Sequence, residues 1–103
     1  VFATNLNSAT GAGSALQQAG LLGQVKMIGF DAGPAQVEQL RAGVVQALIA
    51  QLPGDIGAQG VEQAVASVRG ESVTAEIPTD ATIVTADNVD DPEVQAVLYK
   101  ASC

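Results

Sequence analysis

The chain has 103 residues, 48% of them hydrophobic, which suits one small packed unit and argues against a disordered segment. Its formal net charge is −7 with only four Lys and Arg residues, which excludes extensive phosphate contacts with nucleic acid and disfavours an anionic membrane surface. There is no His and only one Cys, Cys103, so zinc sites built from several such ligands and a Ser-His-Asp triad are excluded. We expect no metal and no cofactor.

Apolar runs and helical spacing predict strands that alternate with helices along the chain. The predicted strands are apolar runs at residues 1–4, 25–30, 44–50 and 82–85. The predicted helices have apolar residues at helical spacing and cover residues 8–20, 34–43, 53–70 and 91–99. Strands that alternate with helices form parallel βαβ units with right-handed crossovers. The sequence therefore predicts an α/β fold with a parallel sheet and helices on both faces.

Caps and prolines mark the ends of the predicted helices. Asn7 or Ser8 is a suitable cap for the first helix, and Pro34 and Pro53 stand at the first positions of the second and third. Glycines follow the first three helices, as is usual where a helix ends. Residues 72–77 are extended without a clear assignment, and the polar, acidic stretch 86–91 is the best linker candidate.

Polar side chains follow three of the predicted strands at equivalent places. Asn5 follows the first strand, Asp31 the second and Gln51 the third. Ligands of open α/β sheets bind outside the carboxyl ends of the strands, so this spacing brings the three side chains toward one rim. The carboxylate accepts hydrogen bonds and the two amides both accept and donate them, which suits the hydroxyls of a sugar. The alternative for Asn5 and Asp31 is a turn or capping role, whereas Gln51 is not a favoured cap.

Other candidate sites are weaker. The acidic residues of 87–93 are conceivable calcium ligands, but their spacing is not that of an EF-hand, and a solvated helix start is the favoured interpretation. Residues 11–13 (GAG) lie inside a helix pattern and lack the spacing of a dinucleotide-binding turn. No nucleophile has a suitable base, so the sequence favours a binding protein over an enzyme.

Four stretches resemble ribose-type periplasmic sugar-binding proteins of ABC transporters. Residues 1–20, beginning VFATN, resemble the segment that opens the second half of the C-terminal lobe. Residues 28–31 (IGFD) and 48–53 (LIAQLP) resemble the family's strand-plus-aspartate and its hinge-proximal glutamine. Residues 88–95 (NVDDPEVQ) are similar to the ending of actinobacterial members. The likeness covers nearly the whole chain and keeps its order.

This resemblance implies a two-lobed protein that closes on a monosaccharide or related polyol by a hinge and then docks on a membrane permease. It implies sugar-binding roles for Asn5, Asp31 and Gln51. Ribose-type members often have an acidic residue after that asparagine, whereas this chain has Leu6, so the resemblance does not identify the sugar. It also implies a periplasmic or extracellular location, with attachment to the membrane through a lipoprotein anchor or the permease.

The resemblance divides the chain into parts of two lobes. Residues 1–52 correspond to the second half of the C-terminal lobe. Residues 53–86 correspond to a crossover helix and a strand that joins the N-terminal lobe or runs along the hinge, and residues 87–103 to a final hinge segment and helix. We therefore expect residues upstream of Val1, or self-association, to complete the protein. The alternative function is the effector-binding domain of a lactose-repressor-type regulator, and the sequence of residues 87–99 favours transport.

Overall fold

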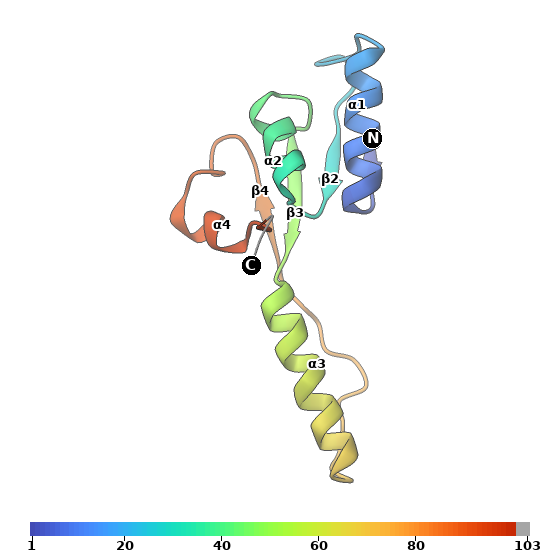
Figure 1. Cartoon of the computed structure of the whole chain (residues 1–103), viewed down its shortest axis with the longest axis vertical. Helices are drawn as coiled ribbons and strands as arrows, with labels where there is room; N and C mark the ends of the chain where they lie inside the picture. The colour runs from blue at the N-terminus through green and yellow to red at the C-terminus, as the bar shows by residue number, and fades with distance from the viewer. Residues whose placement is uncertain (101–103) are drawn as a thin grey trace.

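The computed structural model describes residues 1–100, in which four strands and four helices alternate along the chain (Figure 1). The strands are β1 (Phe2–Ala3), β2 (Ile28–Phe30), β3 (Ala47–Gln51) and β4 (Ala81–Val84). The helices are α1 (Leu6–Gln18), α2 (Pro34–Arg41), α3 (Pro53–Val68) and α4 (Pro92–Val97). Cys103 lies outside the described residues.

The strands form one sheet in the order β1-β2-β3-β4. The first three are parallel, with Ile28 beside both Phe2 and Ala47. β4 is antiparallel to β3 and pairs Ala81 with Gln51. The predicted α/β fold is confirmed for a mostly parallel sheet. The direction of β4 departs from the prediction because α3 leads away from the sheet, so the chain comes back to β3 from the opposite end.

The core lies on the face of the sheet that α1 and α2 cover. α1 packs against β1, β2 and α2, and Val94 of α4 joins the same core. Gly29 of β2 lets α1 come close, because an added Cβ would lie 3.0 Å from Leu48 Cδ2 and 3.2 Å from Ala9 Cβ. The buried apolar side chains are Ala3, Ala9, Met27, Ala32, Leu40, Val44, Val45, Leu48, Ala50, Val84, Val89 and Val94.

The opposite face of the sheet is open. Side chains alternate between the faces of a strand, so the neighbours of the core residues point away from α1 and α2. Phe2 is 54% exposed, Ile28 41% and Ile83 53%. The prediction placed helices on both faces of the sheet. Within residues 1–100, by contrast, the helices that contribute buried side chains all do so on one face. An apolar face of this kind is typical of a sheet that another element covers.

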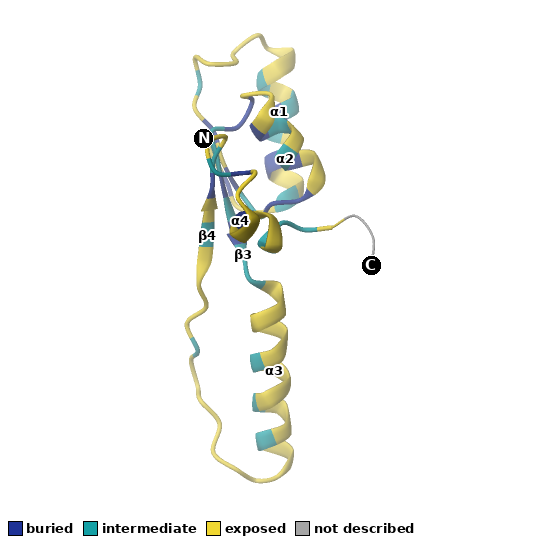
Figure 2. Ribbon diagram, turned by 90° about the vertical axis from the view of Figure 1, so that its left-hand side faces the viewer, coloured by how far each residue is buried: buried dark blue, intermediate teal, exposed yellow. Residues whose placement is uncertain are grey.

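The α3 helix projects from the rest of the chain (Figures 1 and 2). It contains no buried residue, and Val68 is 90% exposed. The residues that follow it return beside the helix in extended form, where the Thr74 N–H donates to Gln63 Oε1 at 2.7 Å. The radius of gyration is 16.6 Å, whereas a compact domain of this length has one of about 13 Å. Within residues 1–100 no helix is both long and apolar enough to cross a membrane.

Several predicted boundaries shift in the structure. The first helix begins at Leu6 with Asn5 as its cap, two residues earlier than predicted. The third strand begins at Ala47, and Gln51 is its last residue. Residues 44 and 45 are buried in the preceding loop, because their side chains enter the core before strand pairing begins. Residues 72–77 form no strand, and the last helix ends at Val97.

Candidate ligand-binding site at the carboxyl ends of the strands

Asp31 is the centre of a polar cluster at the carboxyl ends of the strands. Its Oδ1 accepts hydrogen bonds from Gln51 Nε2 at 2.8 Å and from the Tyr99 hydroxyl at 2.9 Å. Its Oδ2 accepts from the backbone N–H of Leu6 at 3.1 Å, in the first turn of α1. The cluster thus joins the ends of β2 and β3, the start of α1 and the C-terminal segment (residues 87–100). The sequence predicts that Asn5, Asp31 and Gln51 lie at one rim, and the structure places all three at the carboxyl ends of β1, β2 and β3.

The backbone holds Asp31 in an uncommon conformation. Its φ of 75° is the one positive value among the non-glycine residues of 1–100. Asp tolerates this left-handed region better than most residues, although the conformation is less favourable than an extended one. The Asp31 N–H donates to the Ile49 carbonyl at 2.9 Å, so the strand pairing continues up to the residue that carries the carboxylate.

Gln36 fixes the turn that carries Asp31. This side chain is fully buried in α2, and its Oε1 accepts from the Gly33 N–H at 2.9 Å. Its Nε2 donates to the Phe30 carbonyl at 2.9 Å. One amide therefore bridges the two sides of the turn and satisfies both of its own polar atoms, as a buried amide requires. The sequence analysis missed Gln36, although its place three residues after the helix cap Gly33 is a capping-box position.

Asn5 caps α1, which is the role that the sequence analysis gave as the alternative to ligand binding. Its Oδ1 accepts from the Ser8 N–H at 2.9 Å, and the Asn5 N–H donates to Ser8 Oγ at 3.3 Å. This reciprocal pair is a capping box. The Asn5 side chain is exposed at the rim, and its Nδ2 has no hydrogen-bond partner within residues 1–100. Asn5 is therefore a cap whose amide nitrogen is free to donate.

Gln51 faces Asp31 with its amide nitrogen. The Nε2–Oδ1 bond fixes which end of the amide points to the carboxylate, because only the nitrogen end donates. Within the described residues, its Oε1 has no hydrogen-bond donor. The side chain is partly buried at the point where β3 passes into α3. Gln51 therefore presents an acceptor beside the carboxylate of Asp31.

Tyr99 is the cluster residue that the sequence analysis did not single out. Its backbone N–H donates to the Ala32 carbonyl at 3.0 Å, next to Asp31. Burial raises the pKa of the Tyr99 phenol, and the Asp31 carboxylate raises it further, against an opposing effect of Gln51. Tyr99 thus remains a protonated donor at neutral pH. No spacing signal predicts this contact, because the two residues are 68 positions apart.

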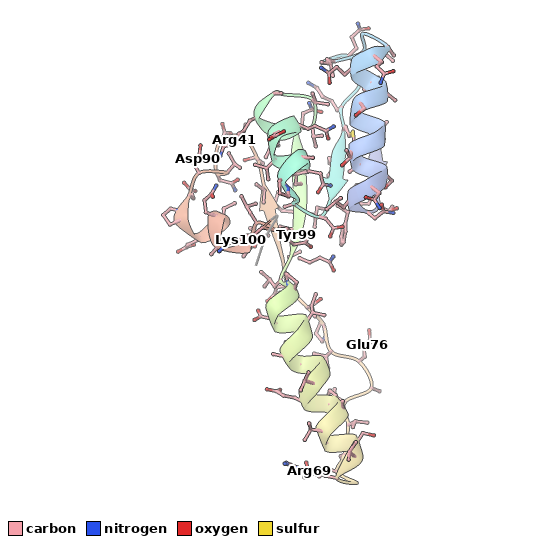
Figure 3. All side chains as sticks on the ribbon, viewed as in Figure 1. Arg41, Arg69, Glu76, Asp90, Tyr99 and Lys100 are labelled. Carbon is pink, nitrogen blue, oxygen red and sulfur yellow. The ribbon has the colours of Figure 1, made fainter. Side chains whose placement is uncertain are left out.

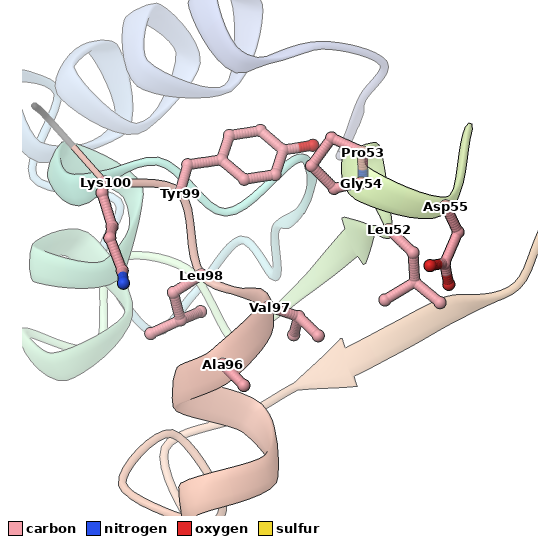
Figure 4. A pocket seen from close by; sticks show the side chains of 9 residues that line it. All are labelled: Leu52, Pro53, Gly54, Asp55, Ala96, Val97, Leu98, Tyr99 and Lys100. Carbon is pink, nitrogen blue, oxygen red and sulfur yellow. The ribbon is translucent and has the colours of Figure 1, made fainter. Parts of the chain in front are cut away.

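A groove of about 650 Å³ lies on the other side of Tyr99, between α4 and the start of α3 (Figure 4). Its lining is Leu52, Pro53, Gly54, Asp55, Ala96, Val97, Leu98, Tyr99 and Lys100. Of the cluster, only Tyr99 lines this groove, and Asn5, Asp31 and Gln51 do not. The polar cluster holds the convergent donors and acceptors that orient a small polar ligand, so we take it as the candidate site.

The acidic stretch before α4 is held by an ion pair. Arg41 at the end of α2 donates through Nη2 to Asp90 Oδ1 at 2.5 Å and through Nη1 to Oδ2 at 3.3 Å. The two side chains are 48% and 73% exposed, so this pair contributes little to stability. Both are labelled in Figure 3.

In the part of the chain that the structure describes, no group of three or more His, Cys, Asp or Glu residues is arranged to hold a metal ion.

Comparison with known proteins identifies the family of the chain. Residues 1–72 match the family described as the periplasmic binding protein domain. The chain belongs to the periplasmic binding protein family. The earlier resemblance to its ribose-type members is confirmed, because the ribose import binding protein of Salmonella typhimurium is 45% identical over 84 residues. That match covers 82% of this chain and 28% of the relative, so the chain spans less than a third of that relative's length.

Two solved solute-binding proteins show the same fold. An ABC transporter solute-binding protein from Agrobacterium vitis, bound with α-D-tagatopyranose, is 37% identical with a TM-score of 0.86, over 96% of this chain and 35% of its own. A carbohydrate transporter solute-binding protein from Agrobacterium radiobacter, in complex with D-arabinose, is 37% identical with a TM-score of 0.84, over 96% and 34%. The expectation that the chain binds rather than catalyses agrees with a family of binding proteins.

Proposed function

We propose that this chain is part of the substrate-binding component of a carbohydrate ABC importer, which binds a monosaccharide between two lobes by hinge closure. The observation that carries the proposal is the convergence of hydrogen-bonding groups on Asp31 at the carboxyl ends of the strands. Relatives that bind ribose, arabinose and tagatose by name support a sugar as the ligand.

The site residues divide the recognition of the sugar hydroxyls. Asp31 accepts a hydroxyl hydrogen at Oδ2, and Gln51 accepts one at Oε1. Asn5 donates through Nδ2 while its Oδ1 remains the cap of α1. Hydrogen bonds to a charged group contribute about 1.5–3 kcal/mol each, so the carboxylate carries the largest share. Leu6 stands where ribose-type members often have an acidic residue, and its part in the site is the backbone N–H that faces Asp31.

The other lobe supplies the missing half of the site. Residues 1–52 belong to the second half of the C-terminal lobe. Residues 53–86 are a crossover helix and a strand that returns to the N-terminal lobe or the hinge, and residues 87–103 are the C-terminal hinge segment and helix. The exposed apolar side chains of α3 support this division, because they have no cover within residues 1–100. The pairing of β4 with β3 supports a hinge position for the returning strand.

The whole protein acts outside the cytoplasmic membrane and delivers its sugar to an ABC permease. It is periplasmic or extracellular, and a lipoprotein anchor or the permease itself keeps it at the membrane. The names of the relatives support this location, since they are import binding proteins and transporter solute-binding proteins. The same relatives favour transport over a lactose-repressor-type regulator.

A thermal unfolding experiment on the complete protein tests the proposed function. D-ribose, D-arabinose and further pentoses, hexoses and polyols are added one at a time. A sugar at 100 times its dissociation constant stabilises the folded protein by about 2.7 kcal/mol. We expect the midpoint to rise by several degrees with one class of sugar. No shift with any compound would contradict a sugar ligand.

Asp31→Asn tests the carboxylate in the same assay. Asn keeps the size of the side chain and tolerates the positive φ, so the backbone is preserved. The loss of one charged hydrogen bond should weaken sugar binding by about 10- to 100-fold. Glu38→Gln is the matched control, because it removes one carboxylate from an exposed position on α2. Equal affinity of wild type and Asp31→Asn would remove Asp31 from the site.

A further inference from the structure

We propose that Tyr99 is a positioning residue, which holds the carboxylate of Asp31 so that one acceptor position on Oδ2 faces the ligand. This inference rests on the proposed function, and it adds a residue of the C-terminal segment to the sugar site. The Tyr99 hydroxyl donates to Oδ1 at 2.9 Å. Its role is exerted through Asp31.

The hydrogen bonds of the carboxylate lead to this assignment. An ionised carboxylate has about four acceptor positions, two on each oxygen. Gln51 and Tyr99 fill both positions of Oδ1, and the Leu6 N–H fills one on Oδ2. One position on Oδ2 is left within residues 1–100. The protein thus presents a single, directed acceptor to a hydroxyl of the ligand.

Removal of the tyrosine hydroxyl makes this acceptor ambiguous. Oδ1 then gains an open position, so the carboxylate offers one acceptor on each oxygen. The terminal torsion of an Asp side chain has a broad, roughly two-fold preference and gives little resistance to rotation. Both water and differently placed sugar hydroxyls would find an acceptor. Affinity and the discrimination between epimers should therefore fall together.

The structure also holds Tyr99 itself in place. Its N–H bond to the Ala32 carbonyl joins the C-terminal segment to the turn that carries Asp31. Upstream, Val94 is buried in the core, and the Arg41–Asp90 ion pair joins the start of the segment to α2. The ring lies above the groove and extends toward the start of α3 (Figure 4). A donor anchored in this way orients its acceptor.

Titration calorimetry with the complete protein tests the proposal. D-ribose and D-arabinose, which differ only in configuration at C2, are titrated into wild type, Tyr99→Phe and Lys100→Ala. We expect Tyr99→Phe to weaken the better sugar by about tenfold, equivalent to about 1.4 kcal/mol. We also expect the ratio of the two affinities to fall by about threefold. Lys100→Ala, the control in the next position of the same segment, should leave both values unchanged.

Two outcomes would overturn the positioning role. In the first, Tyr99→Phe binds both sugars as wild type does. In the second, both affinities fall by the same factor together with the unfolding midpoint of the sugar-free protein, which indicates a structural role alone. The ratio of affinities separates these cases, because a general loss of folded protein does not change which epimer is preferred.

A second measurement needs no sugar. The difference in tyrosine absorbance between wild type and Tyr99→Phe, followed through alkaline pH, gives the ionisation of Tyr99. The same difference is measured in the Asp31→Asn background, where the pKa of Tyr99 should be lower because the facing negative charge is gone. An unchanged pKa would refute the contact itself. If wild type binds neither sugar, the proposed function fails for these ligands, and this titration decides the contact independently.

Discussion

The sheet unit (residues 1–51 and 81–100) and the arm (residues 52–80) are built from similar residues and have opposite surroundings. Both contain helices with apolar residues at helical spacing. In the sheet unit, these side chains reach a common core that includes the fully buried Met27 and Leu48. In the arm, α3 buries no residue (Figure 2), and Val61, Val65 and Val68 are exposed.

The difference shows that apolar residues at helical spacing predict a helix but do not specify which element packs against its apolar face. Helical stability in proteins comes mainly from the packing of an apolar face, and within residues 1–100 the apolar side chains of α3 have no such packing. The chain matches only 28% of the length of its ribose-binding relative. The proposed second lobe supplies such packing, and the predictions below compare the two regions directly.

The largest effect is expected from paired truncations in the two regions. Leu48→Ala removes a fully buried side chain and should lower the free energy of unfolding by about 2–5 kcal/mol. Val65→Ala in the 103-residue chain should change it by less than about 0.5 kcal/mol, because Val65 is exposed there. Denaturant unfolding measures both. In the complete protein, a loss of about 1 kcal/mol or more for Val65→Ala is expected, and its absence would show that no lobe covers α3.

Glycine substitutions should have opposite signs in the two regions. Gly29→Ala places a Cβ against Leu48 and Ala9 and should destabilise the protein by about 1–3 kcal/mol. Gly57→Ala lies inside α3 with open space around it, and should stabilise the 103-residue chain by about 0.5–1 kcal/mol through helix propensity. Thermal or denaturant unfolding measures both. A destabilising Gly57→Ala in the complete protein would locate a close contact on α3.

The smallest effect is expected at the ion pair within the sheet unit. Asp90→Asn breaks the pair with Arg41, and both partners are largely exposed to solvent. We expect a loss of at most about 1 kcal/mol, which decreases further when salt is added. Unfolding at low and high ionic strength measures it. A loss that salt does not reduce would mean that Asp90 acts through the shape of its loop instead.

The sequence predicted the parts of the site that depend on strand ends. Asn5, Asp31 and Gln51 each end or follow a strand, and parallel strands bring such residues to one edge. Gln36 and Tyr99 were not predicted as site residues. For Gln36 a local signal exists, because its place three residues after the helix cap Gly33 is a capping-box position. The contact of Tyr99 depends on how the C-terminal segment packs against the turn at Asp31, and no local spacing encodes that packing.

The direction of β4 was also beyond the local pattern. Alternating strands and helices predict parallel crossovers, because a helix of ordinary length packs back over its sheet. α3 does not pack on the sheet, so the rule that links helix to parallel strand does not apply to it. The apolar residues of α3 are compatible both with a helix that packs on its own sheet and with one that projects from it. Only the surroundings of the helix distinguish these two cases.

Because β4 runs antiparallel to β3 and pairs Ala81 with Gln51, residues 52–80 are topologically the loop of a β-hairpin. Ordinary hairpins close such a pair with two residues, often Asn-Gly. The whole arm is therefore an insertion at a hairpin tip. An Asn-Gly turn in place of the arm would join the two strands in their present register and leave the sheet unit as a chain of its own.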